Sequence, residues 1–321
     1  MNTHKLAPGA VIAAIGICML FAGNSSAGEP KAVPKLQVIP LPYDQASFQR
    51  NGVELTRYHF SPSVHRPFLY PVNGPSGWSL TRMGHPHDPE SHSHHNSVWT
   101  SHHDVAGVNF WSDGGKGTIR HKRIAKYADG GQCSQIVAEN EWVDGDDRVL
   151  LDETRKIAVV LLDQSEWLAV IDIQLAARGQ TVTLGKTPFG VIGVRMAKTI
   201  GVHDGAGTIR NSEGGVDEKE VFWKRARWVD YSGPVKKRTH IEGVTLFDHP
   251  DNLNHPAHFH VRNDGWMGAS LCFEGPRDIE PDKPLSLRYG LYVHADMPET
   301  EAIDAQWKKF AKLDPDKLLE K

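Results

Sequence analysis

Short segments in which β-branched and aromatic residues alternate with polar residues recur along most of the chain. Glycine, proline, asparagine and aspartate residues separate these segments. This pattern is typical of the strands of a β-sandwich or barrel, and it differs from an alternation of strands and helices. We expect strands at residues 53–60, 66–72, 97–103, 118–127, 134–143, 148–162, 166–177, 189–197, 220–230, 243–249, 257–263, 267–274 and 285–295.

The two longest segments lie at the centre of this series. Residues 148–162 and 166–177 are separated only by Asp163, Gln164 and Ser165, which suit a hairpin turn, so they predict a long antiparallel pair. At least twelve candidate strands without an obvious break favour one large antiparallel double-sheet sandwich. The fold class that we expect is therefore all-β.

One helix is predicted near the end of the sequence. It starts at Pro298, and Ile303, Trp307, Phe310 and Ala311 recur at the spacing of one helical face. We expect this short C-terminal helix to pack its apolar stripe on the sandwich.

The first 27 residues read as a secretory signal peptide. A basic start is followed by an apolar run at 10–22 and by small residues that end at Ala27, where cleavage is expected. The apolar run is too short to span a bilayer, which takes roughly 20 residues. We therefore expect a secreted or periplasmic protein with no transmembrane segment after cleavage, and a single β-sandwich domain at 28–321.

Charge and cysteine content narrow the function classes. The formal net charge is −3 with acidic and basic residues interleaved, so a nucleic-acid partner is not expected. Cys133 and Cys272 remain after cleavage and could form one disulfide in an oxidising compartment. Two cysteines are too few for a thiolate-rich zinc or iron–sulfur site, so any metal would be held by nitrogen and oxygen.

The segment 84–104 carries the densest group of possible metal ligands and acid–base groups. On an extended chain His92 and His94 share one face, His95 lies on the other, and His102 rejoins the first face. His92, His94 and His102 could hold a metal ion. Alternatively, His94 and His95 could act as general acid and base on a sugar hydroxyl.

Aromatic residues around these histidines favour a pocket over a solvated loop. Trp99, Phe110 and Trp111 place the cluster in apolar sequence. Trp99 and His102 are therefore candidates for substrate binding.

A second group of polar residues occupies 247–264. In its strand His258, His260 and Arg262 share the face opposite to the apolar residues, which suits a binding surface, although a solvated sheet face has the same pattern. Asp248 and Asn252 lie in the preceding proline-broken loop, a natural place for groups that contact a ligand.

Arg195 leaves the small-residue face of an otherwise apolar strand. A guanidinium in such a place is expected to reach a carboxylate, either a structural partner within the protein or a group of the substrate.

Four motifs in order give the chain a family resemblance. They read HSHHNSVWTSHHDVAGVNFW (92–111), GVRMA (193–197), KRARWVDYSG (224–233) and DHPDNLNHP (248–256), and RPFLYPVNGPSG (66–77) resembles the beginning of the family. With these motifs the chain resembles the PmoA-like proteins, mostly uncharacterised secreted bacterial proteins often labelled methane oxygenase PmoA. It departs from their pattern at Ser93 and Asn96, where the family tends to have proline and arginine, so a possible anion contact of the relatives is missing here.

The resemblance implies both a fold and a set of site positions. The family resembles the aldose (galactose) mutarotases, whose supersandwich binds a sugar across a concave sheet where imidazoles and a carboxylate act on it. The matching positions here are His92, His94, His95, Trp99, His102, Asp104, Gly107, Arg195, Asp248, His249, Pro250, Asn252, His260 and Arg262.

These observations lead first to a carbohydrate-active enzyme. His94 or His95 and His258 or His260 would be the acid and base, and Arg195 or Arg262 would orient a carboxylate or hydroxyl of a small-molecule or oligosaccharide substrate. Epimerisation, hydrolysis and lyase elimination remain open.

Two alternatives belong to other classes. One is a copper or non-haem iron oxidoreductase that uses the histidine-rich segment as ligands, so the cofactor is either a divalent metal or none. The other is a non-catalytic glycan-binding module, for which the aromatic residues matter and the histidines do not.

Overall fold

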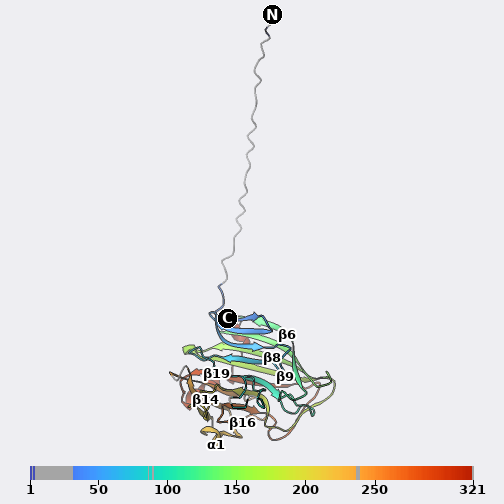
Figure 1. Cartoon of the computed structure of the whole chain (residues 1–321), viewed down its shortest axis with the longest axis vertical. Coiled ribbons are helices and arrows are strands. Elements are labelled where there is room, and N and C mark those ends of the chain that lie inside the picture. The colour runs from blue at the N-terminus through green and yellow to red at the C-terminus, as the bar shows by residue number, and fades with distance from the viewer. Residues whose placement is uncertain (2, 4–31, 86, 89, 236–238, 320–321) are drawn as a thin grey trace. The chain divides into compact units, whose positions relative to one another are not determined.

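Figure 1 shows the computed structural model of the chain, which describes residues 1, 3, 32–85, 87–88, 90–235 and 239–319. The segment expected to be a signal peptide, 1–27, lies outside the described residues apart from Met1 and Thr3. Residues Pro34–Lys321 form one compact unit. Within the described residues, no helix is long and apolar enough to cross a membrane.

The first large sheet has nine strands in the described part of the chain, all paired antiparallel. Its order across the sheet mixes the beginning of the chain with its later half, so distant segments become neighbours. In that order the strands are β1 (Leu36–Leu41), β2 (Gln45–Arg50), β3 (Val53–His59), β4 (Phe68–Val72), β5 (Val98–His102), β11 (Gly190–Arg195), β17 (Trp266–Ser270), β16 (Ala257–Arg262) and β13 (Lys224–Ala226).

The second large sheet is also antiparallel, and its long central strands run side by side in Figure 1. Eight described strands form it. In order they are β12 (Thr208–Asn211), β14 (Trp228–Val235), β15 (His240–Asp248), β19 (Leu285–Ala295), β9 (Trp167–Ala177), β8 (Val149–Leu161), β7 (Cys133–Val143) and β6 (Thr118–Ala128). A separate short pair joins β10 (Val182–Leu184) and β18 (Arg277–Ile279).

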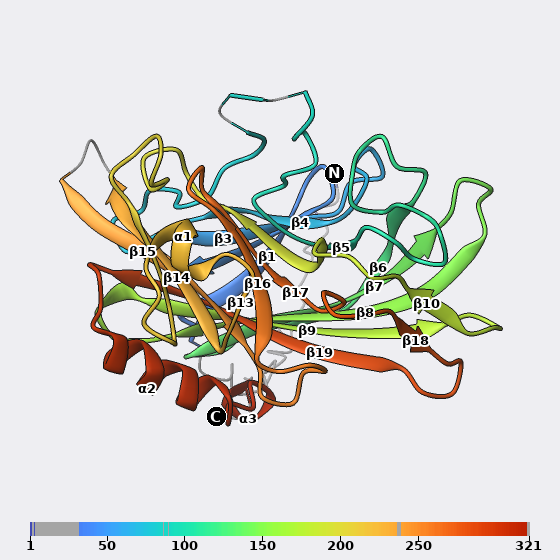
Figure 2. The same ribbon diagram turned by 90° about the horizontal axis from the view of Figure 1, so that it is seen from below.

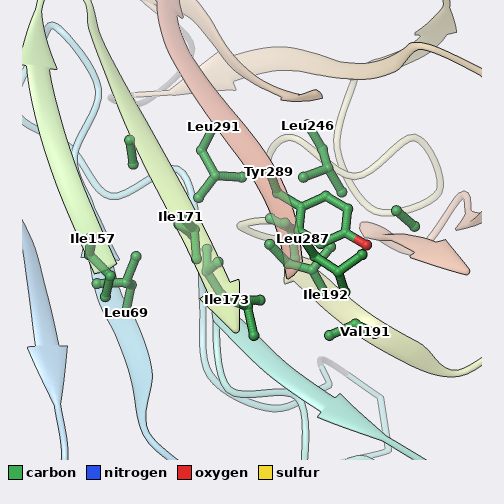
Figure 3. Packing of buried hydrophobic residues seen from close by; sticks show 14 of the residues in the cluster. Leu69, Ile157, Ile171, Ile173, Val191, Ile192, Leu246, Leu287, Tyr289 and Leu291 are labelled. Carbon is green, nitrogen blue, oxygen red and sulfur yellow. The ribbon is translucent and has the colours of Figure 1, made fainter. Parts of the chain in front are cut away.

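The main core lies between the two large sheets. Figure 3 shows Ile157, Ile171 and Leu291 of the second sheet in the same apolar cluster as Leu69 and Ile192 of the first. These side chains are nearly or fully buried. Side chains alternate between the two faces of a strand. The strands of the first sheet therefore pack one face against this core and present the other face away from it, where a site can form.

Among the described residues, three α-helices accompany the strands: α1 (Asp217–Val221), α2 (Thr300–Phe310) and α3 (Asp316–Leu319). Figure 2 shows α2 alongside the sheets, and its buried Ile303 and Phe310 pack in a second cluster with Trp228 and Phe247. The expected C-terminal helix is therefore confirmed. The expected hairpin is confirmed too, since β8 and β9 pair along their length and the short 3₁₀ turn η1 (Asp163–Ser165) connects them.

The all-β antiparallel double-sheet fold predicted from the sequence is confirmed, with one wrong strand. Residues 220–230 do not form one strand, because α1 ends at Val221 and the chain bends at Trp223 (φ 58°) before β13 begins. The sequence prediction also missed the first two strands, β1 and β2, and the short strands β10, β12 and β18. Cys133 and Cys272 are both buried and unpaired, so the possible disulfide does not form in this structure.

Candidate functional site

A cavity of about 810 Å³ opens on the outer face of the first sheet. Its wall comes from β11, β16 and β17 and from loops that carry His92, Trp111, Phe189 and Trp223. The sheet therefore supplies a fixed base, and segments far apart in the sequence close the sides.

The strand register explains how the base is built. Trp99, Gly193, Gly268 and His260 lie in one row across β5, β11, β17 and β16. A Cβ atom on Gly193 would lie 2.5 Å from the indole of Trp266 and 2.9 Å from that of Trp99. The two glycines therefore leave room for indole rings to lie against the backbone of the sheet.

Two imidazole rings contact the indole of Trp266 from different sides. The ring of His95 stacks on it with centroids 5.3 Å apart and planes 14° apart. The ring of His260 meets it edge-on at 5.9 Å, and Phe189 and Phe222 flank His260 at 5.3 and 5.1 Å. The structure thus brings together histidines from the two polar groups that the sequence identified.

His92, His94 and His95 form a compact cluster, with ring centroids 4.6 to 5.8 Å apart. All three line the cavity. The chain makes a turn at residues 91–94, and β5 begins only at Val98. The expectation of an extended strand through these histidines was therefore wrong, although they do reach a common site.

Burial and neighbouring cations keep the imidazoles of His94, His95 and His260 neutral. Burial lowers the pKa of His260 to about 4. Burial and the nearby guanidinium of Arg66 lower the pKa of His94 to about 4. Burial, followed by His94 and Arg195, lowers the pKa of His95 still further. At pH 7 each ring is neutral and has one nitrogen lone pair that can accept a proton.

Arg195 meets the carboxylate that the sequence predicted, and the partner is Asp264. Arg195 Nη1 donates to Asp264 Oδ1 at 2.9 Å, and His85 Nε2 lies 2.7 Å from Oδ2 of the same carboxylate. His85 Nδ1 accepts the backbone N–H groups of His87 and Asp88. Because Nδ1 accepts these bonds, the ring proton is on Nε2, which donates to Asp264. Asp264 therefore holds both the Arg195 side chain and the loop that carries His85.

Several polar atoms of this region are buried without a hydrogen-bond partner within the described structure. They include Nε and Nη2 of Arg195 and the Nδ1 atoms of His95 and His260. Buried polar atoms are usually paired, so unpaired ones that gather around one cavity are a feature of ligand sites.

Two predicted binding residues from the first histidine group do not line the cavity. His102 is fully buried, lies on the opposite face of β5 from Trp99, and has Nε2 3.0 Å from the backbone oxygen of Gly185. Trp99 is 1% exposed and lies beneath the lining, in contact with His95, Trp111 and Trp266.

The structure also places three residues of the second group away from the cavity. His258 stacks on Phe273 instead. Asp248 is buried; its Oδ1 accepts a hydrogen bond from the side chain of Asn252, and its Oδ2 accepts the backbone N–H of Ala257 and lies 2.7 Å from His255 Nδ1. Asn252 also bonds the backbone of Arg288. The loop motif thus holds the fold together, while Arg262, like His260, does reach the cavity.

The proposed metal set is not assembled. His92 and His94 are neighbours, but His102 points to the other side of the sheet. In the part of the chain that the structure describes, no group of three or more His, Cys, Asp or Glu side chains is placed to hold a metal ion.

Sequence reasoning missed His85, Phe189, Phe222, Trp223 and Asp264, all of which line the cavity. The one signal for Asp264 in the sequence was its position two residues after Arg262, just past the strand whose polar face carries His260 and Arg262. Asn96 Oδ1 accepts a hydrogen bond from Arg66 Nη1 at 2.7 Å.

Comparisons with known proteins give a family but no activity. The model of a family described as "Family of unknown function (DUF6807)" matches residues 45–308. No curated protein matches the sequence. The PmoA-like label therefore stays a prediction.

Some solved structures resemble the chain weakly. The heparan sulfate lyase HepC from Pedobacter heparinus is 8% identical, with a TM-score of 0.40 over 83% of this chain and 38% of the lyase. A GalM/aldose epimerase homologue from C. elegans is 7% identical, with a TM-score of 0.33 over 82% of this chain and 99% of its own. The chain spans well under half the length of the lyase.

Proposed function

We propose that this chain, which belongs to the family of unknown function DUF6807, is a carbohydrate-active enzyme that uses the cavity histidines as acid and base. The observation that carries the proposal is the group of neutral, buried imidazoles of His94, His95 and His260 around one aromatic cavity. Perturbed titratable groups in a cleft mark candidate catalytic sites.

A sugar suits the cavity in size and chemistry. A volume of about 810 Å³ falls in the range of small-molecule sites. Phe189 offers a partly exposed ring, Trp111 and Trp266 add apolar ring atoms to the wall, and His260 and Arg262 offer polar groups beside them. Sugars need both kinds of contact, because they have apolar C–H faces and a rim of hydroxyl groups.

The ionisation states favour a reaction that starts with proton removal. A neutral imidazole can take a proton from a hydroxyl or from an activated carbon, and the imidazolium so formed can return it. Hydrolysis of glycosides commonly uses two carboxyl groups. Among the described lining residues, Asp264 is the one carboxylate, and Arg195 and His85 already occupy it. The site therefore suits epimerisation or elimination better than hydrolysis.

Arg195 would have an orienting role in this scheme. Its side chain is 1% exposed, Asp264 holds one nitrogen, and two others have no partner in the described structure. The fixed positive charge stabilises negative charge that develops on a nearby substrate oxygen. His258, Asp248 and Asn252 have no place in this proposal, because their contacts are structural or lie elsewhere.

We also propose that the protein acts outside the cytoplasm. The support is the sequence of residues 1–27, with its apolar run and its small residues before Gly28. N-terminal sequencing of the mature protein should begin near Gly28, whereas an intact Met1 in exported protein would contradict signal cleavage.

The enzymatic proposal is tested by turnover. Purified protein is assayed with neutral sugars, uronates and glycosides, and His260→Ala and His94→Ala are compared with His240→Ala, an exposed histidine on β15. Removal of an acid–base group typically costs 10²- to 10⁴-fold in rate. We expect a loss of about 100-fold or more in kcat for the two cavity variants and none for His240→Ala. Full activity in both cavity variants would remove these histidines from the mechanism.

A further inference from the structure

We infer that the substrate is an oligosaccharide chain, one unit of which stacks at the mouth of the cavity on an aromatic ledge formed by Phe222, Trp223 and Phe273. This inference rests on the proposed function and adds a second subsite to it. The ledge lies on the segment between α1 and β13, together with the residue after the turn that follows β17.

Exposure distinguishes Trp223 from the other tryptophans of the site. Trp223 lines the cavity and is nevertheless 45% exposed. Trp99, Trp111 and Trp266 are exposed by 4% or less. A large aromatic side chain loses favourable burial when it stays in water, so an exposed one at the mouth of a cavity is a candidate ligand contact.

The ring contacts continue without a break from the cavity to the ledge. Phe222 lies 5.1 Å from His260, the proposed base. Trp223 stacks on Phe222 with centroids 4.4 Å apart and planes 21° apart, and Phe273 lies 5.5 Å further on. A sugar unit next to the reacting unit would therefore meet the exposed indole.

The backbone holds Trp223 in an unusual conformation. Its φ is 58°, in the left-handed region that bulky residues rarely adopt, and its N–H donates to the Phe259 oxygen at 2.8 Å. Such conformations are strained and tend to gather at functional sites. The bond to β16 fixes the indole relative to His260 on the same strand.

Hydrogen-bonding groups border the ledge. Arg225 and Glu274 form an ion pair of 2.8 Å, and their side chains are 38% and 58% exposed. They follow Trp223 and Phe273 closely in the sequence. Exposed charged groups beside an aromatic face match the hydroxyl rim of a sugar whose C–H face lies on the ring.

The test uses ladders of one to six sugar units cut from cellulose, mannan, chitin and polygalacturonate. Binding is measured by calorimetry, and turnover is measured for each length. We expect the affinity of the wild-type protein to rise at least tenfold from one unit to three. Trp223→Ala should remove most of this gain with length, while Trp223→Phe should retain much of it.

Trp78→Ala is the matched control, since Trp78 is 51% exposed and does not line the cavity. It should keep the full gain with length. A gain with length that is equal in Trp223→Ala and the wild type, or no gain at all in a wild type that turns over a single unit, would overturn the ledge and leave the proposed function standing. A wild-type protein that neither binds nor turns over any ladder would contradict both.

Discussion

Arg195 on β11 donates a 2.9 Å hydrogen bond to Asp264 in the turn between β16 and β17, beside the cavity. Burial by itself would raise the pKa of the Asp264 carboxyl, but Arg195 and His85 outweigh it and the pKa is lowered. The pair is therefore charged at neutral pH, and it joins the central strand of the site to the loop that presents the histidines.

Removal of the charge on Asp264 should destabilise the protein. Asp264→Asn leaves the buried Arg195 guanidinium without its counter-charge, so the free energy of unfolding should fall by about 2 to 3 kcal/mol. Urea denaturation measures this change. Asp251→Asn is the control, because the Asp251 side chain is 92% exposed and should change the free energy by well under 1 kcal/mol. An equal loss of unfolding free energy in the two variants would show that the Arg195–Asp264 pair contributes no more to stability than an exposed carboxylate does.

Gly193 should not tolerate a side chain. The Cβ atom of Gly193→Ala would lie 2.5 Å from Trp266, so the indole must move, and we expect a loss of about 2 kcal/mol in the free energy of unfolding. Tryptophan fluorescence should shift as the ring moves. Gly131→Ala, where a Cβ atom meets nothing within 4 Å, is the control. Unchanged fluorescence and stability in Gly193→Ala would contradict the packing described for Trp266.

Acid should weaken the fold through the cavity histidines. The pKa values of His94 and His260 are lowered to about 4, whereas an unfolded histidine has a pKa near 6.5. Between these values the unfolded state binds more protons, so the free energy of unfolding falls as the pH drops from about 6.5 to 4, by at most about 3 kcal/mol per histidine. Imidazole NMR titration gives the midpoints. Midpoints at or above 6.5 would contradict the neutral-base account.

Much of the fold follows from local pattern. Period-two alternation identified most strands of both sheets, and the spacing of Ile303 and Phe310 identified α2, because burial of one face leaves a visible period in the sequence. The prediction of one strand at 220–230 was wrong, because a long-range contact and not the local pattern sets the backbone there. The apolar residues of this segment also suit a strand, and the bend at Trp223 depends on a hydrogen bond to β16 that local pattern does not record.

The site was only partly predictable. His94, His95, His260, Arg195 and Arg262 were identified because histidine and arginine on apolar segments are uncommon. His85 was missed because its role depends on Asp264, which is 179 residues away. His102 was misplaced because its face depends on where β5 starts.

The role of the loop that carries Asp248 and Asn252 was also not predictable from the sequence. Its motif looked like a ligand-binding loop, because polar residues in a proline-broken segment suit contacts with a substrate. In the structure the carboxylate of Asp248 and the amide of Asn252 form hydrogen bonds within the protein. Sequence alone does not separate these two uses of the same residue types.

The central claim is that the cavity on the first sheet is where a sugar is bound and transformed. The most direct test is a crystal structure of His260→Ala with the sugar that the wild type turns over. We predict a sugar ring in the cavity, against Trp266 and within hydrogen-bond reach of His94 or His95. A sugar bound instead in the groove of the second sheet lined by Lys156, Asp172 and Arg288, with the cavity empty, would contradict the account.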